Sequence, residues 1–480
     1  MDHTSGDKCS DRQKEYKMNK TSKVKGALEV LLVIGLILII PLFFAIKTAA
    51  DKQAAQNTPL PLTPTAIATL VNNATSAKQP PACTFPLAQT TTEESVPEEY
   101  SFSEPQVVLT AVQDNSYNIV DWLPDNQRVL ITRDFRDNNQ QNIELFNPQT
   151  GTVQVYAKRN RIDQPPAWAI GLNAVIYPDT KVLKITENNG MNRPSVEFRR
   201  QLWISRGDPQ NVQLIEDTLL TGNFLSYFSV GIKPGGGQIV YHTHDDKKLS
   251  KRNKSLEVQQ SISLDISQWE YRVRGSGLPI SYSMAWRPNS SQIFLYTLGE
   301  AGGYTFLSDT DTGQICEIDL GRTGNEYGWA DMARWSPDGK YLAIIRTWGS
   351  RPVDTSDLAI LDTMTGKLYV MKIIPPDMEG LHFVNDVAWA PDSYHLTVIA
   401  QVLVQDPTLH TFNKISNLYL VDFLSNQAIQ ISSLSNEKLG SGLGSTNLIW
   451  SSNGSQLLVK CPTGQVDRLC LLSVQKTAHK

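Results

Sequence analysis

Two short stretches of the sequence gather side chains of the kinds that bind metal ions or receptors. His242-Thr243-His244-Asp245-Asp246 holds imidazoles and carboxylates, which are common zinc ligands. A local cluster does not fix a coordination shell, however, and the basic run that follows is typical of an exposed loop. Arg206-Gly207-Asp208 has the composition of an adhesion motif, but Gly-Asp-Pro is equally typical of a turn. We therefore expect no metal site and no cofactor.

Other polar side chains stand a few residues before a set of repeated anchor residues, which are described below. Asp331 and Asp386 are carboxylates of the kind that serve as general acid and base, although no nucleophile with its base can be assigned. The aromatic and amide members suit a peptide or a glycan, whereas the alternative is that they bond to one another and to water. The ligand-binding candidates, expected at the mouth of a central channel, are Tyr117, Asn118, Tyr227, Tyr282, Asp331, Asn385, Asp386 and Asn447.

The sequence contains 5 cysteines, and their spacing is not that of a metal site. Cys461 and Cys470 flank the turn-rich stretch 462–467. They could face each other on a hairpin and form a disulfide in an oxidising compartment.

The N-terminal region predicts a membrane anchor. Residues 26–46 form a 21-residue apolar run with one charge, Glu29, which is long enough to cross a bilayer. Five lysines at 14–25 precede the run, so the positive-inside rule places residues 1–25 in the cytoplasm as a basic tail. A cleaved signal peptide is the alternative, but the run is longer than such peptides use. We expect a single-pass protein of the cell membrane, with everything after residue 46 outside the cytoplasm.

Residues 47–104 are rich in Pro and Thr and show no sustained apolar periodicity. Such a segment buries too little apolar surface to offset the entropy of ordering it. We expect a disordered stalk that holds a folded domain away from the lipid.

From residue 104 onward, an anchor residue is repeatedly followed by a turn and by apolar residues seven and nine positions later. The clearest copy is R-W-S-P-D-G-K-Y-L-A-I-I at 334–345. Proline two residues after five of the anchors presets the turn, and a second turn of Asp or Asn with Gly or Asn follows in several units. The anchors are Trp122, Trp168, Ile232, Trp286, Trp335, Trp389 and Trp450, and their partners seven positions on are Val129, Val175, Ile239, Ile293, Leu342, Leu396 and Leu457.

Four short strands in units that recur every 46 to 64 residues are typical of propeller blades. We predict an all-β fold over residues 105–476, a seven-bladed β-propeller of four-stranded antiparallel blades, with six blades as the less favoured alternative. The last repeat is too short for an outer strand. We therefore expect residues 106–112 to pair with it and latch the ring.

The stretches W-S-P-D-G-K-Y-L at Trp335, W-A-P-D-S at Trp389 and W-R-P-N-S at Trp286 resemble the WD40-like repeats of the TolB-type propeller family. The resemblance covers residues 104–474 and implies the fold, but that family hosts binding, scaffolding and protease-gating roles alike. The order of anchor, stalk and propeller also resembles the front half of dipeptidyl-peptidase-type enzymes. No G-x-S-x-G nucleophile motif occurs and no α/β domain follows the repeats, so we do not expect a protease.

The sequence thus predicts a membrane-tethered extracytoplasmic β-propeller that binds or scaffolds a protein, a peptide or a glycan. One alternative is a propeller-type hydrolase or lyase that acts at the channel mouth, and another is a structural spacer in an envelope complex. After residue 25 the chain carries 37 Lys or Arg against 44 Asp or Glu, a net charge of −7. This mildly acidic body argues against a nucleic-acid partner.

Overall fold

The structure is a computed structural model, and it describes most of the repeat region. The described residues are Cys83 and 99–112, 115–135, 137–160, 165–186, 195–222, 229–233, 238–243, 248–253, 258–263, 281–298, 305–320, 327–350, 353–374, 381–405, 412–434, 446–461 and 466–477. Among them, no helix is both long and apolar enough to cross a membrane. The predicted basic tail, the apolar run 26–46 and nearly all of the predicted stalk lie outside these residues.

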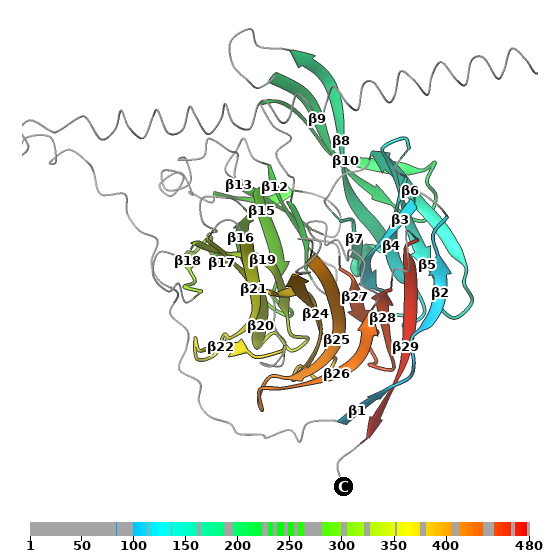
Figure 1. Cartoon of the computed structure of the whole chain (residues 1–480). Helices are drawn as coiled ribbons and strands as arrows, with labels where there is room; N and C mark the ends of the chain where they lie inside the picture. Colours follow the sequence, from blue (N-terminus) through cyan, green and yellow to red (C-terminus); the bar gives the residue numbers. More distant parts are fainter. Residues whose placement is uncertain are drawn as a thin grey trace, which may run out of the picture. The chain divides into compact units, whose positions relative to one another are not determined.

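Six four-stranded antiparallel sheets account for most of the described strands, and each is a blade (Figure 1). Blade 1 consists of β3 (Asn115–Trp122), β4 (Val129–Phe135), β5 (Gln140–Phe146) and β6 (Val153–Asn160). Blade 2 consists of β7 (Ala167–Ala169), β8 (Ala174–Thr186), β9 (Ser195–Ser205) and β10 (Val212–Gly222), with the short 3-10 helix η1 (Ile170–Leu172) after β7. Blade 3 consists of β11 (Ser229–Ile232), β12 (Gln238–Thr243), β13 (Lys248–Asn253) and β14 (Val258–Ser263).

The other three blades follow the same plan. Blade 4 consists of β15 (Ser281–Trp286), β16 (Gln292–Leu298), β17 (Thr305–Asp309) and β18 (Ile315–Glu317). Blade 5 consists of β19 (Tyr327–Trp335), β20 (Tyr341–Ser350), β21 (Val353–Asp362) and β22 (Leu368–Met371). Blade 6 consists of β23 (Leu381–Trp389), β24 (His395–Gln405), β25 (Phe412–Asp422) and β26 (Gln427–Leu434).

The last repeat forms a different sheet, which we call the closing sheet. It contains β27 (Leu448–Trp450), β28 (Gln456–Lys460), β29 (Arg468–Thr477), β1 (Glu99–Phe102) and β2 (Gln106–Thr110). The prediction of seven four-stranded blades is therefore wrong, because the described residues form six such blades and one sheet of five strands.

The closing sheet has its fifth strand because two N-terminal segments pair with one C-terminal strand. β2 pairs with residues 468–471 of β29, and β1 pairs with residues 474–477 further along the same strand. The predicted pairing of residues 106–112 with the last repeat is thus confirmed for β2, whereas β1 was not predicted. Backbone pairing between the two ends of the repeat region covers an otherwise exposed sheet edge.

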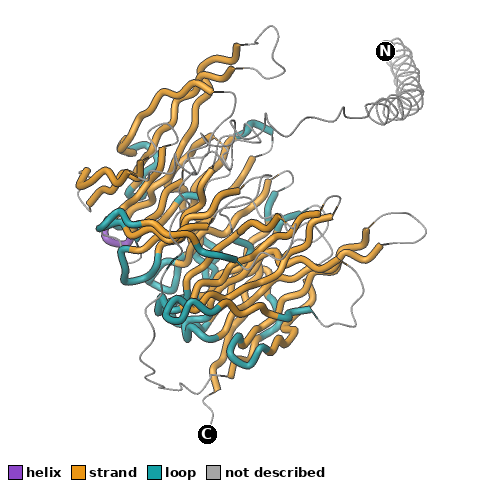
Figure 2. The backbone as a smooth tube through the Cα atoms, turned by 90° about the vertical axis from the view of Figure 1, so that its left-hand side faces the viewer, coloured by secondary structure: helices purple, strands orange, loops and turns teal. Residues whose placement is uncertain are grey.

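The first strands of the sheets contact one another in chain order. β3, β7, β11, β15, β19 and β23 follow in sequence, then β27, and β27 contacts β3 again. The strands of each sheet lead away from this inner set, as the two views in Figures 1 and 2 show. Side chains on the first strands of distant repeats can therefore meet around one centre.

The anchor pattern describes the core correctly. The seven partner residues, seven positions after each anchor, are all at most 2% exposed. Trp335 donates its indole N–H to the carbonyl of Ala285 in the preceding blade at 2.9 Å, and Trp389 donates to Arg334 in the same way at 2.9 Å. These two tryptophans thus satisfy their one polar side-chain atom on the preceding blade. The indole nitrogen of Trp122, in contrast, is buried and has no hydrogen-bond partner.

The predicted second turns are built by their acidic residue. In blade 5 the Asp362 carboxylate accepts hydrogen bonds from the N–H groups of Met364 and Thr365, and Gly366 donates its N–H to the Asp362 carbonyl at 2.7 Å. Gly366 has a φ of 74°, which glycine adopts without steric cost. These local bonds explain why Asp and Gly recur with this spacing.

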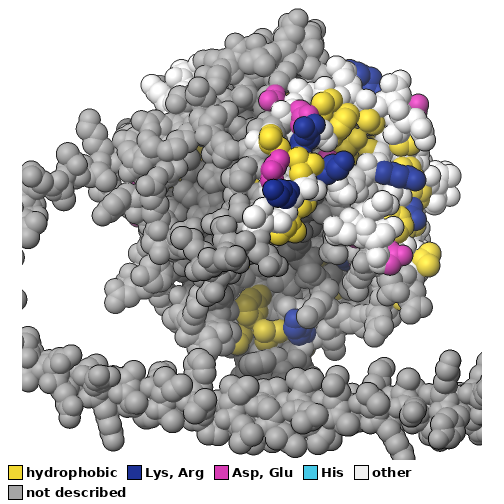
Figure 3. All heavy atoms as spheres, turned by 90° about the horizontal axis from the view of Figure 1, so that it is seen from above, with side chains coloured by type: hydrophobic (Ala, Val, Ile, Leu, Met, Phe, Trp, Pro, Cys, Tyr) yellow, Lys and Arg dark blue, Asp and Glu magenta, His cyan; other side chains and the backbone are white. Residues whose placement is uncertain are grey.

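Blade 2 carries an unusual group of exposed apolar side chains. Val182, Leu183 and Ile185 on β8 and Leu219 on β10 are all exposed, next to the exposed Lys181. Figure 3, seen from above, shows hydrophobic side chains lying beside basic and acidic ones on the described surface. This blade is also the irregular one, since η1 replaces the proline turn after its anchor.

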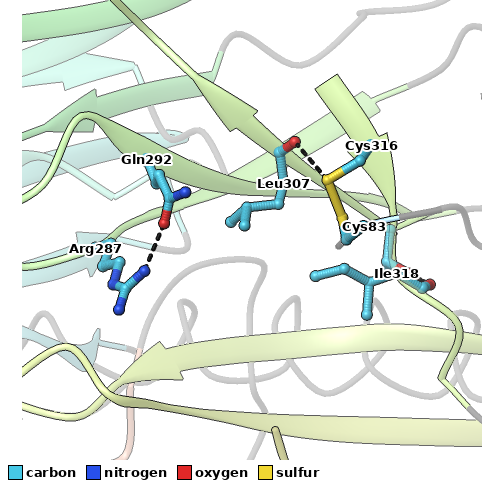
Figure 4. The surroundings of a disulfide bond; sticks show 7 residues. Cys83, Arg287, Gln292, Leu307, Cys316 and Ile318 are labelled. Atoms are coloured by element: carbon cyan, nitrogen blue, oxygen red, sulfur yellow. Dashed lines mark hydrogen bonds between the residues drawn. A yellow bond between two sulfur atoms is a disulfide. The ribbon is translucent and has the colours of Figure 1, made fainter. Parts of the chain in front are cut away.

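Two disulfides tie the described residues together. Cys461 pairs with Cys470 across β28 and β29, the pair that the sequence singles out. Cys83 pairs with Cys316 on β18, a bond that the sequence did not suggest. Cys83 also donates its backbone N–H to the Glu317 carbonyl at 3.1 Å, and Figure 4 shows both cysteines beside Leu307 and Ile318.

Candidate functional site

Three of the first strands are interrupted by β-bulges. The residue without a pairing partner is Val120 in β3, Asp331 in β19 and Asn385 in β23. A bulge adds one residue to a strand, which bends the strand and changes the direction of neighbouring side chains. The bulges therefore act on the residues around them, which include the carboxylates Asp121, Asp331 and Asp386.

The Asp386 carboxylate links two sheets through hydrogen bonds. Its side chain is fully buried, and its carboxylate accepts hydrogen bonds from the Val387 N–H at 2.8 Å, from the Thr446 hydroxyl at 2.9 Å and from the Asn447 N–H. Thr446 in turn donates its N–H to the Ile119 carbonyl of blade 1 at 3.0 Å. One carboxylate thus connects blade 6 to the chain entering the closing sheet, and that chain connects to blade 1.

Burial raises the pKa of the Asp386 carboxyl to about 6, although the Arg334 charge and the three hydrogen bonds lower it. With three donors already bound and no exposed surface, this carboxylate is not available to a ligand.

Asp121, directly after the bulge in β3, is placed differently. Its side chain is exposed, yet burial raises the pKa of its carboxyl to about 6, with the Trp122 N–H and the Arg334 charge opposing the rise. The Asp121 side chain is therefore accessible from solvent, although protein surrounds part of its carboxyl.

Arg334 supplies the cation of this region. The residue is half-buried on β19, and its carbonyl is held by Trp389. Its guanidinium makes no hydrogen bond or ion pair with any of the described residues, but its charge acts on Asp121 and Asp386. The strands that carry them, β19 and β3, are not neighbours in the order of first strands.

Tyr296 and Asp331 complete the surroundings of Arg334. Burial raises the pKa of the Tyr296 hydroxyl, and the charges of both Arg334 and Asp331 act on it. Asp331 is exposed and accepts a hydrogen bond from the Thr347 hydroxyl. Among the described residues, the cation of this region is thus Arg334, and the carboxylates are those of Asp121, Asp331 and Asp386. Together these four groups carry a net charge of −2 when all are ionised.

The other sequence candidates are dispersed. Tyr117 is buried, with its N–H donated to the Asp467 carboxylate at 3.3 Å and with Arg133 over its ring. Asn118 donates its amide to Thr132 at 3.3 Å and to Asp134 at 3.4 Å.

Two candidates on the later repeats are described and are not exposed. Asn385 is half-buried in its bulge, and Asn447 is buried with its side-chain amide nitrogen unbonded. Tyr227 and the side chain of Tyr282 lie outside the described residues. Asp331 therefore stands out among the candidates as both described and exposed.

Sequence reasoning missed Asp121 and Arg334, although a signal for them existed. Both residues stand directly before a tryptophan anchor. In the other repeats this position holds a small or apolar residue, namely Ala167, Gly231, Ala285, Ala388 and Ile449. A charged residue at a position that is otherwise small or apolar is the departure from the repeat that would have identified this pair.

Within the described residues there is no group of three or more His, Cys, Asp or Glu side chains that could hold a metal ion. Of the His242 to Asp246 cluster, only His242 and Thr243 belong to the described residues, at the end of β12.

No protein-family model matches the sequence, and no curated protein matches it. Solved structures with a similar fold include oligogalacturonate lyase from Vibrio parahaemolyticus, at 12% identity and a TM-score of 0.47, covering 79% of this chain and 97% of the lyase. TolB from Acinetobacter baumannii matches at 12% identity and a TM-score of 0.32, covering 70% of this chain and 76% of TolB.

The β-propeller domain of Swd1 from Myceliophteria thermophila also matches, at 9% identity and a TM-score of 0.40, covering 76% of this chain and 99% of the domain. At these identities and scores the matches carry no argument about function. The described part of the chain is a β-propeller, and its function has to be argued from its own residues.

Proposed function

We propose that this chain is a membrane-tethered, extracytoplasmic β-propeller that binds a partner at the centre of its ring. The observation that carries the proposal is Arg334, which is half-buried and whose guanidinium makes no hydrogen bond or ion pair with the described residues. Charged groups inside a protein are normally paired. A half-buried arginine left without a bonded partner suggests a group that a ligand completes.

Two features support the location outside the cytoplasm. The apolar run 26–46 is long enough to cross a bilayer. All four cysteines that follow it are joined in disulfides, which persist in oxidising compartments. Protease digestion of intact host cells tests this topology, because an extracytoplasmic propeller is accessible without lysis and a cytoplasmic one is protected.

The closing sheet lies between blade 6 and blade 1 in the order of contacting first strands. Its first strand β27 contacts β23 on one side and β3 on the other, and its partner residue Leu457 is fully buried like those of the other repeats. Its fourth and fifth strands are supplied by β1 and β2 instead of by the C-terminal repeat.

Among the alternatives, catalysis by Asp386 is disfavoured by its three hydrogen bonds and its complete burial. Asp331 is the remaining exposed carboxylate of the two that the sequence offered. A glycan hydrolase or lyase activity that is lost on Asp331→Asn would favour the enzyme alternative over binding.

The binding proposal is tested by capture from the host's envelope fraction with the detergent-solubilised full chain. The comparison is among the wild type, Arg334→Gln and the control Arg128→Gln, which removes an exposed arginine paired with Asp125 in an anchor turn. We expect a protein or glycan retained by the wild type and by the control but lost by Arg334→Gln. If the wild type, Arg334→Gln and Arg128→Gln all retain the partner equally, the partner binds on the flanks of the propeller. That result would contradict the proposal.

A further inference from the structure

β8 and β9 of blade 2 continue beyond the strands of blade 1 (Figure 1). β7 pairs with β8 only as far as Ile176, and Asn160 of β6 donates its side-chain amide to the Thr180 carbonyl at 3.1 Å. From residue 181 to residue 186, β8 pairs only with β9, and all six side chains are exposed. Because successive side chains of a strand point to opposite faces, both faces of β8 are open to solvent here. We call residues 181–186, with the paired residues 195–199 and 219–222, the blade 2 extension.

One face of the blade 2 extension carries exposed aliphatic side chains. Val182 pairs with Phe198 of β9, and Ile185 pairs with the residue two positions before Phe198, so Val182 and Ile185 share a face. Leu183 is the extra residue of the β-bulge that follows Val182. These three aliphatic side chains are between 42% and 62% exposed. Their contact with water is unfavourable, and burial against a partner would remove that cost.

The other face of the blade 2 extension carries basic side chains. Lys181 lies directly opposite Arg199, and Lys184 shares this face, opposite Glu197. Arg199 forms an ion pair with Asp217 at 3.3 Å, whereas neither lysine makes an ion pair or a hydrogen bond with the described residues. Like charges directly opposite each other on a sheet repel. An anionic partner would relieve the repulsion between Lys181 and Arg199.

This combination of side chains fits a lipid bilayer better than a protein surface. Protein interfaces are enriched in aromatic residues and arginine and are depleted in lysine, whereas residues 181–186 are Lys, Val, Leu, Lys, Ile and Thr. At a bilayer surface, aliphatic side chains reach the acyl chains while lysines extend to the headgroup phosphates. A second copy paired along the free edge of β8 would bring the lysines of both copies together, which their like charge opposes.

We infer that the blade 2 extension dips into the surface of the lipid bilayer to which this chain is tethered. The inference rests on the membrane tether of the proposed function and adds a second contact with the same bilayer. Because a tether keeps the propeller near the membrane, this contact needs little affinity of its own. The contact is shallow, since the free edge of β8 has backbone groups without partners, and such groups are excluded from the hydrocarbon core.

A nitroxide label at position 185 of the full chain tests the inference in vesicles of phosphatidylglycerol and phosphatidylcholine. Ile185→Cys supplies the attachment point together with Cys9→Ser, because the other four cysteines are joined in disulfides. The matched control is a label at Val370→Cys in blade 5, which is 49% exposed. We expect the label at position 185 to lose accessibility to an aqueous nickel complex and to gain accessibility to oxygen, which concentrates in lipid. The label at position 370 should remain accessible to nickel.

Variants separate the contributions of the two faces. Lys181→Gln with Lys184→Gln should restore part of the nickel accessibility at position 185, and added salt should act in the same way by screening the lysines. Val182→Ser with Leu183→Ser should restore nickel accessibility in salt as well, because it removes the aliphatic contact. Arg128→Gln should behave as the unchanged sequence, and unchanged thermal unfolding of each variant shows that it is folded.

Two results would overturn the inference. The first is equal nickel accessibility of the labels at positions 185 and 370 in vesicles. The second is shielding at position 185 that increases with protein concentration and is independent of the lysines, because a second copy would then cover the blade 2 extension.

Failure of this inference is distinguishable from failure of the membrane tether. If the chain resists extraction from the vesicles by alkaline carbonate while position 185 stays accessible to nickel, the inference is overturned and the tether is supported. If carbonate removes the chain and position 185 stays accessible, both are overturned. If carbonate removes the chain although position 185 is shielded in the vesicles, the tether is overturned and the contact of the blade 2 extension is supported.

Discussion

At the scale of single residues, the two raised carboxyl pKa values make stability depend on pH. The Asp386 carboxyl has a pKa of about 6 in the folded protein, against a reference value of 3.8. Between those values the folded state binds the extra proton, so this part of the stability is present in acid and is lost as the pH rises through about 6.

For the fully buried Asp386 the loss amounts to at most about 3 kcal/mol. We expect Asp386→Asn to destabilise the protein, since an amide cannot accept from all three donors, and also to flatten the fall between pH 4 and 6. Denaturant unfolding at several pH values measures both effects. Asp137→Asn, which changes an exposed aspartate, is the control and should parallel the wild type. An Asp386→Asn curve parallel to the wild type would contradict the prediction.

At the scale of strands, β1 is held to the ring by more than backbone pairing. The Tyr100 hydroxyl donates to the Asp392 carboxylate of blade 6 at 2.9 Å, and its ring packs edge-on against His395 and Trp450. Asp392 also contacts His395 at 2.6 Å, and its hydrogen bonds lower the pKa of its carboxyl to about 2 against the opposing effect of burial. Because this pKa is depressed, the contribution of Asp392 is present above pH 3.8 and is lost as the pH falls towards 2.

We expect Tyr100→Phe to cost about 1–2 kcal/mol, because it leaves one lone-pair site of the Asp392 carboxylate without its donor. The cost should decrease as the pH falls towards 2, because protonation of Asp392 weakens its acceptor oxygens. Tyr369→Phe is the matched control, since the Tyr369 hydroxyl makes no hydrogen bond to the described residues. A cost that persists unchanged in acid would show that the hydroxyl acts in some other way.

The repeat pattern also makes a prediction about packing. Leu342, seven positions after the Trp335 anchor, is fully buried between blades 4 and 5. Leu342→Ala should lower the free energy of unfolding by about 2–5 kcal/mol through lost burial and the cavity left behind. Val370→Ala in the same blade removes an exposed side chain and should change stability by less than about 0.5 kcal/mol. Similar losses in both variants would refute the assignment of the repeat to the core.

At the scale of the whole molecule, the two disulfides should differ in what they contribute. Cys83 and Cys316 are separated by 233 residues, and Cys461 and Cys470 by 9. A longer closed loop restricts the unfolded chain more, which corresponds to about 5 kcal/mol for the first bond and about 3 kcal/mol for the second. The double variant Cys83→Ser with Cys316→Ser should therefore be the less stable pair in thermal unfolding. The opposite order would mean that strain or local packing outweighs chain entropy.

The Cys83 bond also determines where the N-terminal segment leaves the propeller. With the bond intact, that segment is fastened to β18 of blade 4 before it reaches β1 in the closing sheet. Cys83 is thus fastened to blade 4, whereas β1 and β2 pair with the closing sheet.

The sequence determined the features that depend on short-range spacing. Anchor and partner residues lie on adjacent strands of one hairpin, and turn residues act within five positions, so their pattern survives in the linear chain. The strand content, the buried core positions and the pairing of β2 with the last repeat were all predictable for this reason. The number of four-stranded blades was not, because β1 adds to the last sheet through pairing between opposite ends of the repeat region.

The tertiary structure alone decided which polar side chains meet. Asp121 and Arg334 come from repeats far apart in the chain, and Asp386 and Thr446 come from successive ones. Whether a carboxylate there is buried and hydrogen-bonded, as Asp386 is, or exposed, as Asp121 is, depends on the bulges and on the packing of neighbouring sheets. Spacing along the chain carries no information on such contacts, because they are set by the packing of whole sheets and not by neighbours in sequence.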